Sequence, residues 1–378
     1  MNTRPRVVFI KCDSYDTTDH AVSRLFELIE SDQPFCRKGQ KILLKPNLLT
    51  DRHPDNAATT HPALLKSIAR EIKKREATPL IGDSPASANK IQSVLEKTGI
   101  LSLSSEEGIG LINMEESGSV FFEHGNFQFT ISKAVLECDV LINVPKFKTH
   151  SLTTITAAVK NLYGTVPGYQ KTIFHRNYPD IRTFSELLNA IAEKVPVSFN
   201  IIDAIVGMEG NGPSAGTPKH FNFIAGCKDP YELDYFLCLL LGIPISNVPY
   251  LRYKKGKSLP SSIKEMNVVG DTDWIPHVPK CSVPSTFLID LIPPYLGKIL
   301  KSLIWIRPFI DQTKCQKCMK CVKACPVSAW QIKNQSYPPS LSQEKCIGCC
   351  CCHEVCPANA ITMRPSPFLR FIRKGRMP

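Results

Sequence analysis

The stretch KCQKCMKCVKACPVSA at residues 314–329 and the stretch KCIGCCCCHEVCPANA at residues 345–360 repeat one pattern. Each has four cysteines at the spacing C-x2-C-x2-C-x3-C, followed by proline. A cubane cluster needs one thiolate per iron, and in this motif three cysteines serve one cluster while the fourth ligates the other. The spacing therefore predicts two [4Fe-4S] clusters, the first held by Cys315, Cys318, Cys321 and Cys356, and the second by Cys346, Cys349, Cys352 and Cys325.

The repeat resembles bacterial two-cluster ferredoxins over residues 312–362, which implies a small α+β ferredoxin-like domain there. Zinc is the alternative for clustered cysteines, but a four-cysteine zinc site needs two C-x2-C hooks, whereas each half here offers the full ferredoxin spacing. Cys350 and Cys351 lie in the second loop beside the predicted ligands. They are either buried filler or redox-sensitive thiols.

Upstream of the repeat, short apolar runs alternate with amphipathic stretches across residues 5–285. This alternation is typical of βαβ units, so we expect an α/β domain with a mainly parallel sheet flanked by helices. The predicted strands are Arg6–Cys12, Lys41–Pro46, Pro79–Asp83, Asp139–Pro145, Phe199–Val206, Phe221–Ala225 and Met266–Gly270, and the predicted helices lie around Ala21–Ile29, Leu64–Lys74, Thr153–Leu162, Phe184–Lys194 and Tyr231–Leu241.

Two further segments complete the expected organisation, a proline-rich helical connector at residues 286–311 and a basic tail at residues 363–378. The connector is apolar enough to pack between the two domains or to lie at a membrane interface, and the tail combines basic with apolar residues. Peripheral membrane contact through both is therefore an open alternative. The first residues lack the apolar segment of a secretory signal, so we expect a cytoplasmic protein whose clustered cysteines bind metal.

The candidate site of the α/β domain follows from the polar residues at the predicted strand ends. In an open α/β sheet, ligands bind beyond the carboxyl ends of the strands. Lys146, Lys148 and His150 alternate with period two, so in an extended segment all three project from one face and suit a carboxylate or phosphate. The predicted helix from Thr153 would add its N-terminal dipole. The candidate catalytic residues are Lys146, Lys148, His150, Glu209 and Asp83.

Substrate-binding candidates surround the same strand ends, although a plain surface role remains the alternative for the basic residues. The glycine-rich loop at residues 207–219 offers backbone N–H groups for a phosphate, and Glu209 within it suits a base or a metal ligand. A structural turn or a mobile lid is the alternative for this loop. The candidate substrate-binding residues are Lys45, Asn47, Lys160, Asn161 and Asn211.

Several motifs resemble one uncharacterised family, the domain of unknown function 362, over residues 5–285. They are LLKPNLL, THPALL, IGDSP, NVPKFKTHSLTTITAAVKNLYG and GMEGNGP. Members of this family often carry the same ferredoxin appendage. The resemblance implies an iron-sulfur protein with a shared site but names no substrate.

These features together predict electron transfer through two [4Fe-4S] clusters by a redox enzyme acting on an anionic small molecule. The alternative is an electron-transfer protein or subunit whose α/β domain docks a partner enzyme, because the formal charge of +12 suits an acidic partner protein as well as an anionic substrate. Nucleic acid is disfavoured as a partner, since no recognition helix is visible and aromatic residues make up only 8% of the chain. No flavin or nicotinamide fingerprint is present.

Overall fold

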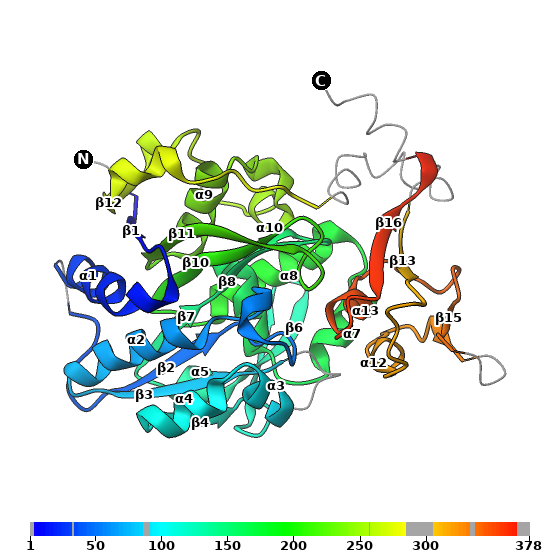
Figure 1. The fold of residues 1–378 in the computed structure, drawn as a ribbon, viewed down its shortest axis with the longest axis horizontal. Coiled ribbons are helices and arrows are strands. Elements are labelled where there is room, and N and C mark those ends of the chain that lie inside the picture. The colour runs from blue at the N-terminus through cyan, green and yellow to red at the C-terminus, as the bar shows by residue number, and fades with distance from the viewer. Residues whose placement is uncertain are drawn as a thin grey trace.

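The computed structural model describes residues 4–31, 34–85, 91–256, 258–284, 305–332 and 337–368. A ten-stranded sheet forms the centre of the α/β domain (Figure 1). Its strand order is β12 (Asn267–Gly270), β1 (Arg6–Lys11), β11 (Thr217–Cys227), β10 (Phe199–Glu209), β7 (Val140–Val144), β2 (Lys41–Pro46), β3 (Thr78–Asp83) and β4 (Gly110–Asn113), with β8 (Lys146–His150) pairing with both β10 and β9 (Thr154–Thr156).

Most neighbouring strands run parallel, as the sequence predicts. β11 is antiparallel to both of its neighbours, and β9 is antiparallel to β8; the other pairs are parallel. All seven strands predicted from the apolar runs are present, with bounds shifted by a few residues. The chain therefore has an α/β fold with a mainly parallel sheet flanked by helices.

The sheet is buried on both faces because successive side chains along each strand point to opposite sides. In β1, Val7 and Phe9 enter one hydrophobic core, whereas Val8 and Ile10 enter the other. The first core is covered by α5 (Lys133–Glu137), α6 (Ala158–Asn161), α7 (Gln170–Asn177), α8 (Ile181–Lys194), α9 (Pro230–Leu241) and α10 (Pro249–Arg252), and the second by α1 (Thr18–Glu30), α2 (Pro62–Lys74), α3 (Ile91–Lys97) and α4 (Ile100–Glu107).

The two ends of α9 show how the local sequence determines where a helix begins and ends. Asp229 caps the first turn by accepting hydrogen bonds from the N–H groups of Tyr231 and Glu232, and Pro230 occupies the first helical position, where no N–H is needed. Gly242 ends the helix at a φ of 71°, a left-handed conformation that glycine adopts without strain. All but one of the residues of α9 are buried, which places it in the first core.

The helix predicted at Thr153–Leu162 is wrong in its first half. Thr154–Thr156 form β9 instead, because β-branched threonine and isoleucine favour strands and here pair with β8. The short helix α6 begins only at Ala158. Its first N–H groups donate to the carboxylate of Asp234 on α9, so the expected helix dipole faces a protein side chain rather than a ligand.

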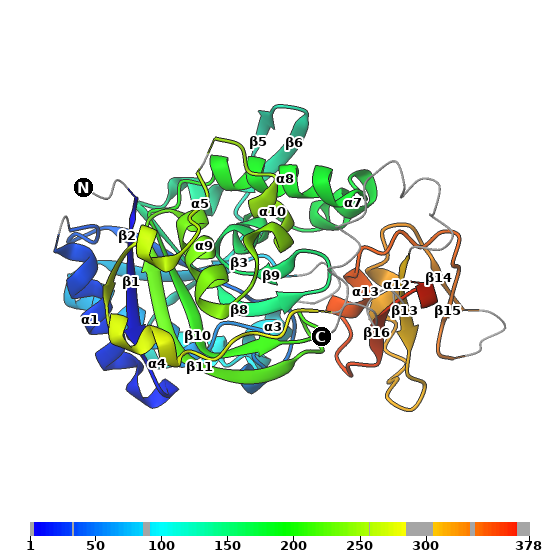
Figure 2. The same cartoon turned by 90° about the horizontal axis from the view of Figure 1, so that it is seen from above.

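In the part that the structure describes, the C-terminal module has two small antiparallel sheets and two short helices. β13 (Ile306–Ile310) pairs with β16 (Ile361–Pro365), and β14 (Trp330–Gln331) pairs with β15 (Ser340–Leu341). The helices α12 (Lys320–Lys323) and α13 (Cys351–Glu354) each lie within one cysteine motif. This module is the predicted α+β domain, and it lies at one end of the α/β domain in both views (Figures 1 and 2).

The boundaries of the module differ from those expected. β13 occupies the end of the predicted helical connector, since Ile306–Ile310 supplies the partner strand that β16 needs. β16 itself runs past residue 362 to Pro365. The rest of the connector, residues 286–304, and most of the basic tail, residues 369–378, lie outside the described residues. Within the described ranges, no helix is long and apolar enough to cross a membrane.

Two other groups of elements complete the fold. A hairpin of β5 (Ser119–His124) and β6 (Phe127–Ser132) extends from the side of the α/β domain that carries α8 (Figure 2). Short 3-10 helices lie at Tyr15–Thr17, Pro54–Asn56, Leu162–Thr165, Ile245–Asn247, Ile263–Glu265 and Thr272–His277.

Candidate functional site

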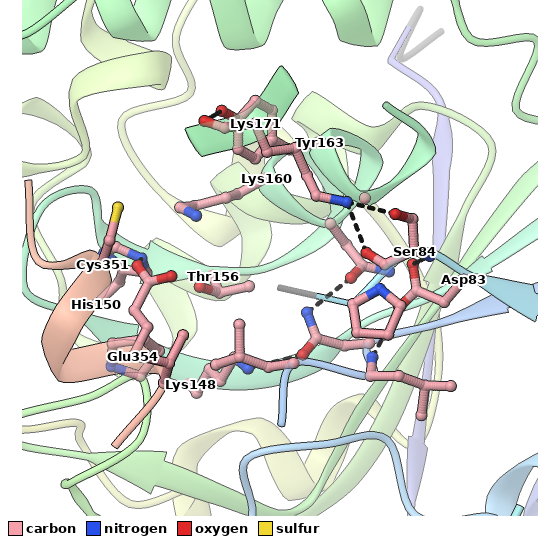
Figure 3. Close-up of a pocket in the computed structure, with 18 of the residues that line it drawn as sticks. Asp83, Ser84, Lys148, His150, Thr156, Lys160, Tyr163, Lys171, Cys351 and Glu354 are labelled. Atoms are coloured by element: carbon pink, nitrogen blue, oxygen red, sulfur yellow. Dashed lines mark hydrogen bonds and ion pairs between the residues drawn. The ribbon is translucent and has the colours of Figure 1, made fainter. Parts of the chain in front are cut away.

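A cavity of about 770 Å³ lies where the C-terminal module meets the carboxyl ends of β2 and β3 and the strands β8 and β9 (Figure 3). This is the place where open α/β sheets bind ligands. The cavity brings together seven of the ten predicted site residues of the α/β domain: Lys45, Asn47, Asp83, Lys148, His150, Lys160 and Asn161.

Lys45 and Asp83 form a closed ion pair at the base of the cavity. Lys45 Nζ lies 2.7 Å from Asp83 Oδ1, and both side chains are almost fully buried. Burial lowers the pKa of Lys45, and the charge of Asp83 opposes that shift. Asp83 also accepts hydrogen bonds from the N–H groups of Leu48 and Ser84. A Cβ atom at Gly164 would lie 2.7 Å from Lys45 Nζ and from Asp83 Oδ1, so only glycine permits this close approach.

Next to this pair, asparagine side chains form a hydrogen-bonded chain that positions Lys148. Asn47 Nδ2 donates to Asn161 Oδ1 at 2.8 Å, and Asn161 Nδ2 donates to Asn143 Oδ1 at 2.7 Å. Lys148 Nζ donates to Asn47 Oδ1 at 2.7 Å and to the carbonyl of Ala58 at 2.6 Å. Burial, reinforced by the charge of Lys160, holds the pKa of Lys148 well below its usual value. An anion bound near Lys148 would favour the charged form of this lysine and so oppose the lowering of its pKa.

His150 and Glu354 form the wall between the two parts of the chain. His150 Nδ1 accepts hydrogen bonds from the N–H groups of Leu152 and Thr153, so the ring proton is on Nε2. Burial lowers the pKa of His150 to about 3, which keeps the ring neutral. Burial raises the pKa of Glu354, but His150 and Lys160 more than reverse this and hold it well below the usual range.

Several polar atoms in this wall lack a hydrogen-bond partner. His150 Nε2, Thr156 Oγ1 and Glu354 Oε1 are buried without a hydrogen bond of good geometry, although the first and last lie 2.8 Å apart. Within the described part of the chain, Lys160 Nζ makes no hydrogen bond or ion pair and lies 5.7 Å from the centre of the Tyr163 ring. Figure 3 shows these groups on one side of the cavity. Buried polar groups without partners are costly, so they indicate a place for a polar ligand.

Three predicted site residues lie outside the cavity lining. Lys146 is neutralised by Asp203 at 2.9 Å and also donates to the Tyr15 hydroxyl. Glu209 pairs with Lys219 at 2.8 Å, because β10 and β11 bring the two side chains together. The Asn211 residue is exposed to solvent, and its backbone carbonyl lies 3.1 Å from Nε2 of His353. The structure therefore does not bring these three residues into the cavity with the other seven.

The glycine-rich loop contacts the C-terminal module. Ser214 Oγ donates to the carbonyl of Glu354 at 2.8 Å, and Arg52 donates to the carbonyls of Ser214 and Cys356. A second contact joins Lys320 to Asp51 at 2.8 Å. These bonds show the loop as an interdomain contact rather than as the phosphate cradle that the sequence allowed.

The cavity also has wall residues that sequence reasoning missed. Lys171 donates from Nζ to the carbonyl and hydroxyl of Ser84 and to the carbonyl of Val166, and burial lowers its pKa to about 8. Its three N–H bonds are all used, so it joins α7 to the end of β3. Ser84 could have been found from its place after the Asp83 strand end, and Thr156 and Tyr163 from their places near His150 and Asn161, but the others come from segments farther along the chain. The missed residues are Ser84, Thr156, Tyr163, Lys171, His175, Cys351 and Glu354.

Two smaller cavities within the module test whether its cysteines suit iron-sulfur clusters. One, of about 310 Å³, is lined by Cys325, Cys346, Cys349 and Cys352, and the other, of about 370 Å³, by Cys315, Cys318, Cys321 and Cys356. Each cavity thus has four of the predicted ligand cysteines, three from one motif and one from the other, as crossed ligation requires. The residues fit the clusters. Cys350 also lines the first of these cavities, whereas Cys351 lines the large one.

Comparisons with known proteins agree with this division. Residues 42–238 match the family described as Domain of unknown function (DUF362), and residues 307–357 match a 4Fe-4S dicluster domain. Thylakoid-associated protein sll1697 of Synechocystis sp. is 30% identical over 264 residues, which are 69% of this chain and 82% of that protein.

Two solved structures share part of the fold at 14% sequence identity. The lactate racemase apoprotein from Thermoanaerobacterium thermosaccharolyticum has a TM-score of 0.40, with 62% of this chain and 56% of that chain covered. A Thermotoga maritima protein has a TM-score of 0.38, with 58% and 57% covered. This chain thus spans little more than half of either structure.

The family match covers the strands and helices that build the large cavity, and the dicluster match covers both cysteine motifs. The C-terminal module therefore binds [4Fe-4S] clusters and has the iron-sulfur electron-transfer role of such domains. The chain belongs to the family described as Domain of unknown function (DUF362), with a 4Fe-4S dicluster domain at its C-terminal end.

Proposed function

We propose that this protein is an iron-sulfur oxidoreductase with two [4Fe-4S] clusters, acting on a small anionic molecule in the large cavity. One observation carries the proposal: a single cavity is lined both by the lysines of the α/β domain and by Cys351 and Glu354 of α13. α13 contains Cys352, a predicted ligand of the second cluster. When bound, the clusters supply one-electron transfer.

The charges of the cavity favour a small anion of low charge. Lys45 is balanced by Asp83, and His150 is neutral because burial lowers its pKa to about 3. Lys171 is held by the carbonyls of Ser84 and Val166, and Lys148 and Lys160 face one carboxylate, Glu354, so the cavity with all its lysines charged has two positive charges in excess. A carboxylate or phosphate oxygen beside these two lysines would favour their charged forms.

The unpartnered polar groups would orient such an anion. The Thr156 hydroxyl is a buried donor without an acceptor, and Lys160 has all its N–H bonds available within the described residues. These donors line the same cavity as Glu354 and Cys351, so an anion bound to them would lie beside α13. The buried walls keep bulk water away from it, which strengthens each of these contacts.

The position of the cavity also favours the second cluster site over the first as the partner in electron transfer with the bound anion. Ala324 lines the cavity and precedes Cys325, and Cys351 lies next to Cys352. Both of these neighbouring cysteines belong to the predicted second group. Electrons would therefore pass between the anion and the second cluster site.

Burial argues against the alternative that the basic strand ends dock a partner enzyme. Lys45, Lys146 and Lys148 are at most 1% exposed. A protein surface cannot contact them, whereas a small molecule that enters the cavity can approach Lys148. These lysines therefore cannot supply the basic surface that a docked acidic partner enzyme would need.

The test is to reduce the anaerobically purified full chain and follow cluster reoxidation by low-temperature EPR as size-separated cell-extract fractions are added. We expect the small-molecule fraction to reoxidise the protein, and Lys160→Met to slow this about tenfold through loss of one charge contact. Lys228→Met, at an exposed lysine outside the cavity, is the matched control. Reoxidation by the macromolecular fraction alone would identify an electron carrier instead.

For the cellular location, we propose a cytoplasmic protein with peripheral membrane contact. The name of the Synechocystis relative, Thylakoid-associated protein, favours such contact. The segments concerned, residues 286–304 and 369–378, lie outside the described residues. Co-flotation of the full chain with anionic vesicles, and its loss when residues 369–378 are deleted, would support the tail as the contact; unchanged flotation would contradict it.

A further inference from the structure

The two predicted cluster sites differ in their access to solvent. Among the eight predicted ligands, Cys318 is the exposed one, whereas Cys352 and Cys356 are buried. The cavity around the first group is lined by Gln316 and Lys317, and both of these residues are exposed. The first cluster site therefore reaches the surface of the module, while the second adjoins the large cavity.

The surface around Cys318 is strongly basic. Lys314, Lys317 and Lys323 are exposed. Lys317 and Lys323 form no ion pair with any described residue, and Lys314 has only an exposed partner, Asp311, at 3.8 Å. The described part of the module has seven lysines and arginines (Arg307, Lys314, Lys317, Lys320, Lys323, Lys345 and Arg364) and three acids (Asp311, Glu344 and Glu354).

Glu354 does not reduce this surface charge, because its side chain is only 12% exposed and belongs to the wall of the large cavity. Lys320 is engaged with Asp51. Three of the six remaining basic residues in the described part of the module, Lys314, Lys317 and Lys323, thus lie close in sequence to its exposed cysteine.

We infer that the Lys314–Cys318 loop, together with Lys323, is the docking surface for an acidic one-electron carrier protein. Opposite charges steer two redox proteins together and fix their orientation. Each encounter moves one electron between the carrier and the module, so one is oxidised as the other is reduced, and no bond or proton changes. This inference rests on the electron-transfer part of the proposed function and does not need the anion site.

The chemistry of the loop favours a protein over a membrane surface. Interfacial binding to lipid needs large apolar side chains beside the basic ones. The large exposed apolar residues of the described module are Phe309, Ile332, Tyr337 and Phe368, none of which is in residues 311–323. The loop instead exposes lysine, glutamine and threonine around Cys318.

The test compares two double variants of the full, cluster-loaded chain that change net charge equally. Lys314→Glu with Lys317→Glu alters the loop, and Lys228→Glu with Lys264→Glu alters exposed lysines of the α/β domain. The probe is an oxidised plant-type [2Fe–2S] ferredoxin chosen for its acidic surface, and calorimetric titration at low and moderate salt gives the Kd. We expect the loop variant to bind about tenfold more weakly with a reduced salt dependence, and the control to bind as the wild type does.

Iron content and EPR spectra of both variants first establish that the clusters are retained. Equal weakening in the two variants would overturn the inference, because net charge alone would then explain it. Absence of wild-type binding, or loss of vesicle binding rather than carrier binding in the loop variant, would overturn it as well. No small molecule enters this titration, so its failure would leave the reoxidation test of the anion site unaffected.

Discussion

His150 and Glu354 meet across the boundary between the α/β domain and the cysteine-rich module, with Nε2 of the histidine 2.8 Å from Oε1 of the glutamate. Their side chains are 1% and 12% exposed. β8 holds the first and α13 holds the second, so the wall of the large cavity exists only when both parts of the chain are in place. A displacement of the module would therefore open the wall of the cavity at this contact.

Replacing Glu354 with glutamine should strengthen anion binding. The substitution keeps the shape of the side chain but removes the one carboxylate that faces Lys148 and Lys160. We expect the half-saturating concentration of the active small-molecule fraction in the EPR assay to fall about tenfold. Glu209→Gln, outside the cavity, should leave it unchanged. Weaker binding by Glu354→Gln would mean that the glutamate contacts a donor group of the ligand.

Removing the charge of Lys45 should destabilise the fold. Lys45→Met leaves the buried carboxylate of Asp83 without its ion-pair partner, and such a loss costs about 3–5 kcal/mol. Urea unfolding followed by circular dichroism measures the change. The double variant Lys45→Met with Asp83→Asn should lose less, because no buried charge is then left alone. Equal losses in the single and double variants would show that packing rather than charge sets the cost.

The stability of the protein should depend on pH through Asp234, which lies far in sequence from the cysteines predicted to hold the clusters. Burial raises the pKa of Asp234 from 3.8 to about 7, against the hydrogen bonds from Ala158, Val159 and Tyr250 that lower it. Between these two values the unfolded chain has lost the proton that the folded chain keeps. The free energy of unfolding therefore falls as pH rises through this window and levels off above pH 7.

The comparison that isolates this effect is between the wild type and Asp234→Asn at pH 5 and pH 8. We expect the wild type to lose ~2 kcal/mol more than the variant between these two values, because the asparagine cannot ionise. Other ionisable groups are common to both proteins and cancel in the difference. Parallel pH profiles of the two proteins would contradict the raised pKa. They would mean that the carboxylate of Asp234 stays ionised from pH 5 to pH 8 while it caps α6.

The strands were predictable because each is a short apolar run whose alternate residues are buried on opposite faces. β8 was missed as a separate strand, yet the period of Lys146, Lys148 and His150 correctly indicated an extended segment. The helix expected at Thr153 was wrong because its apolar spacing fits a helix while its β-branched residues pair with β8. The spacing of the apolar residues alone could not decide between a helix and a strand in this segment.

The site was predictable only in part, because it depends on which distant side chains meet. Lys146 looks like its neighbour Lys148 in sequence, but Asp203 of β10 neutralises it in the fold. Glu354 gave no signal beyond its place in a cysteine motif, since its role comes from packing against β8. Strand ends therefore located the site, and tertiary pairing selected the residues that line it.

Crossed ligation of the clusters gives a prediction that separates the eight ligand cysteines from the two additional ones. Cys356 lies in the second motif, but it lines the same cavity as Cys315, Cys318 and Cys321. Cys356→Ala should therefore disturb the same EPR signal as Cys315→Ala, and Cys325→Ala the same signal as Cys346→Ala. A pairing by motif instead would place Cys356 with Cys346 and contradict the geometry of the two cavities.

The additional cysteines provide the control for these substitutions. Cys350 is 3% exposed and Cys351 is 7% exposed, so replacing either with alanine removes one buried sulfur without changing any predicted ligand. We expect Cys350→Ala and Cys351→Ala to keep the iron content and both EPR signals of the wild type, whereas each ligand substitution lowers the iron content. Because Cys351 lines the large cavity and Cys350 does not, only Cys351→Ala should also alter the rate at which the small-molecule fraction reoxidises the protein. Loss of a cluster signal from Cys350→Ala would instead mean that the second motif uses a shifted set of ligands.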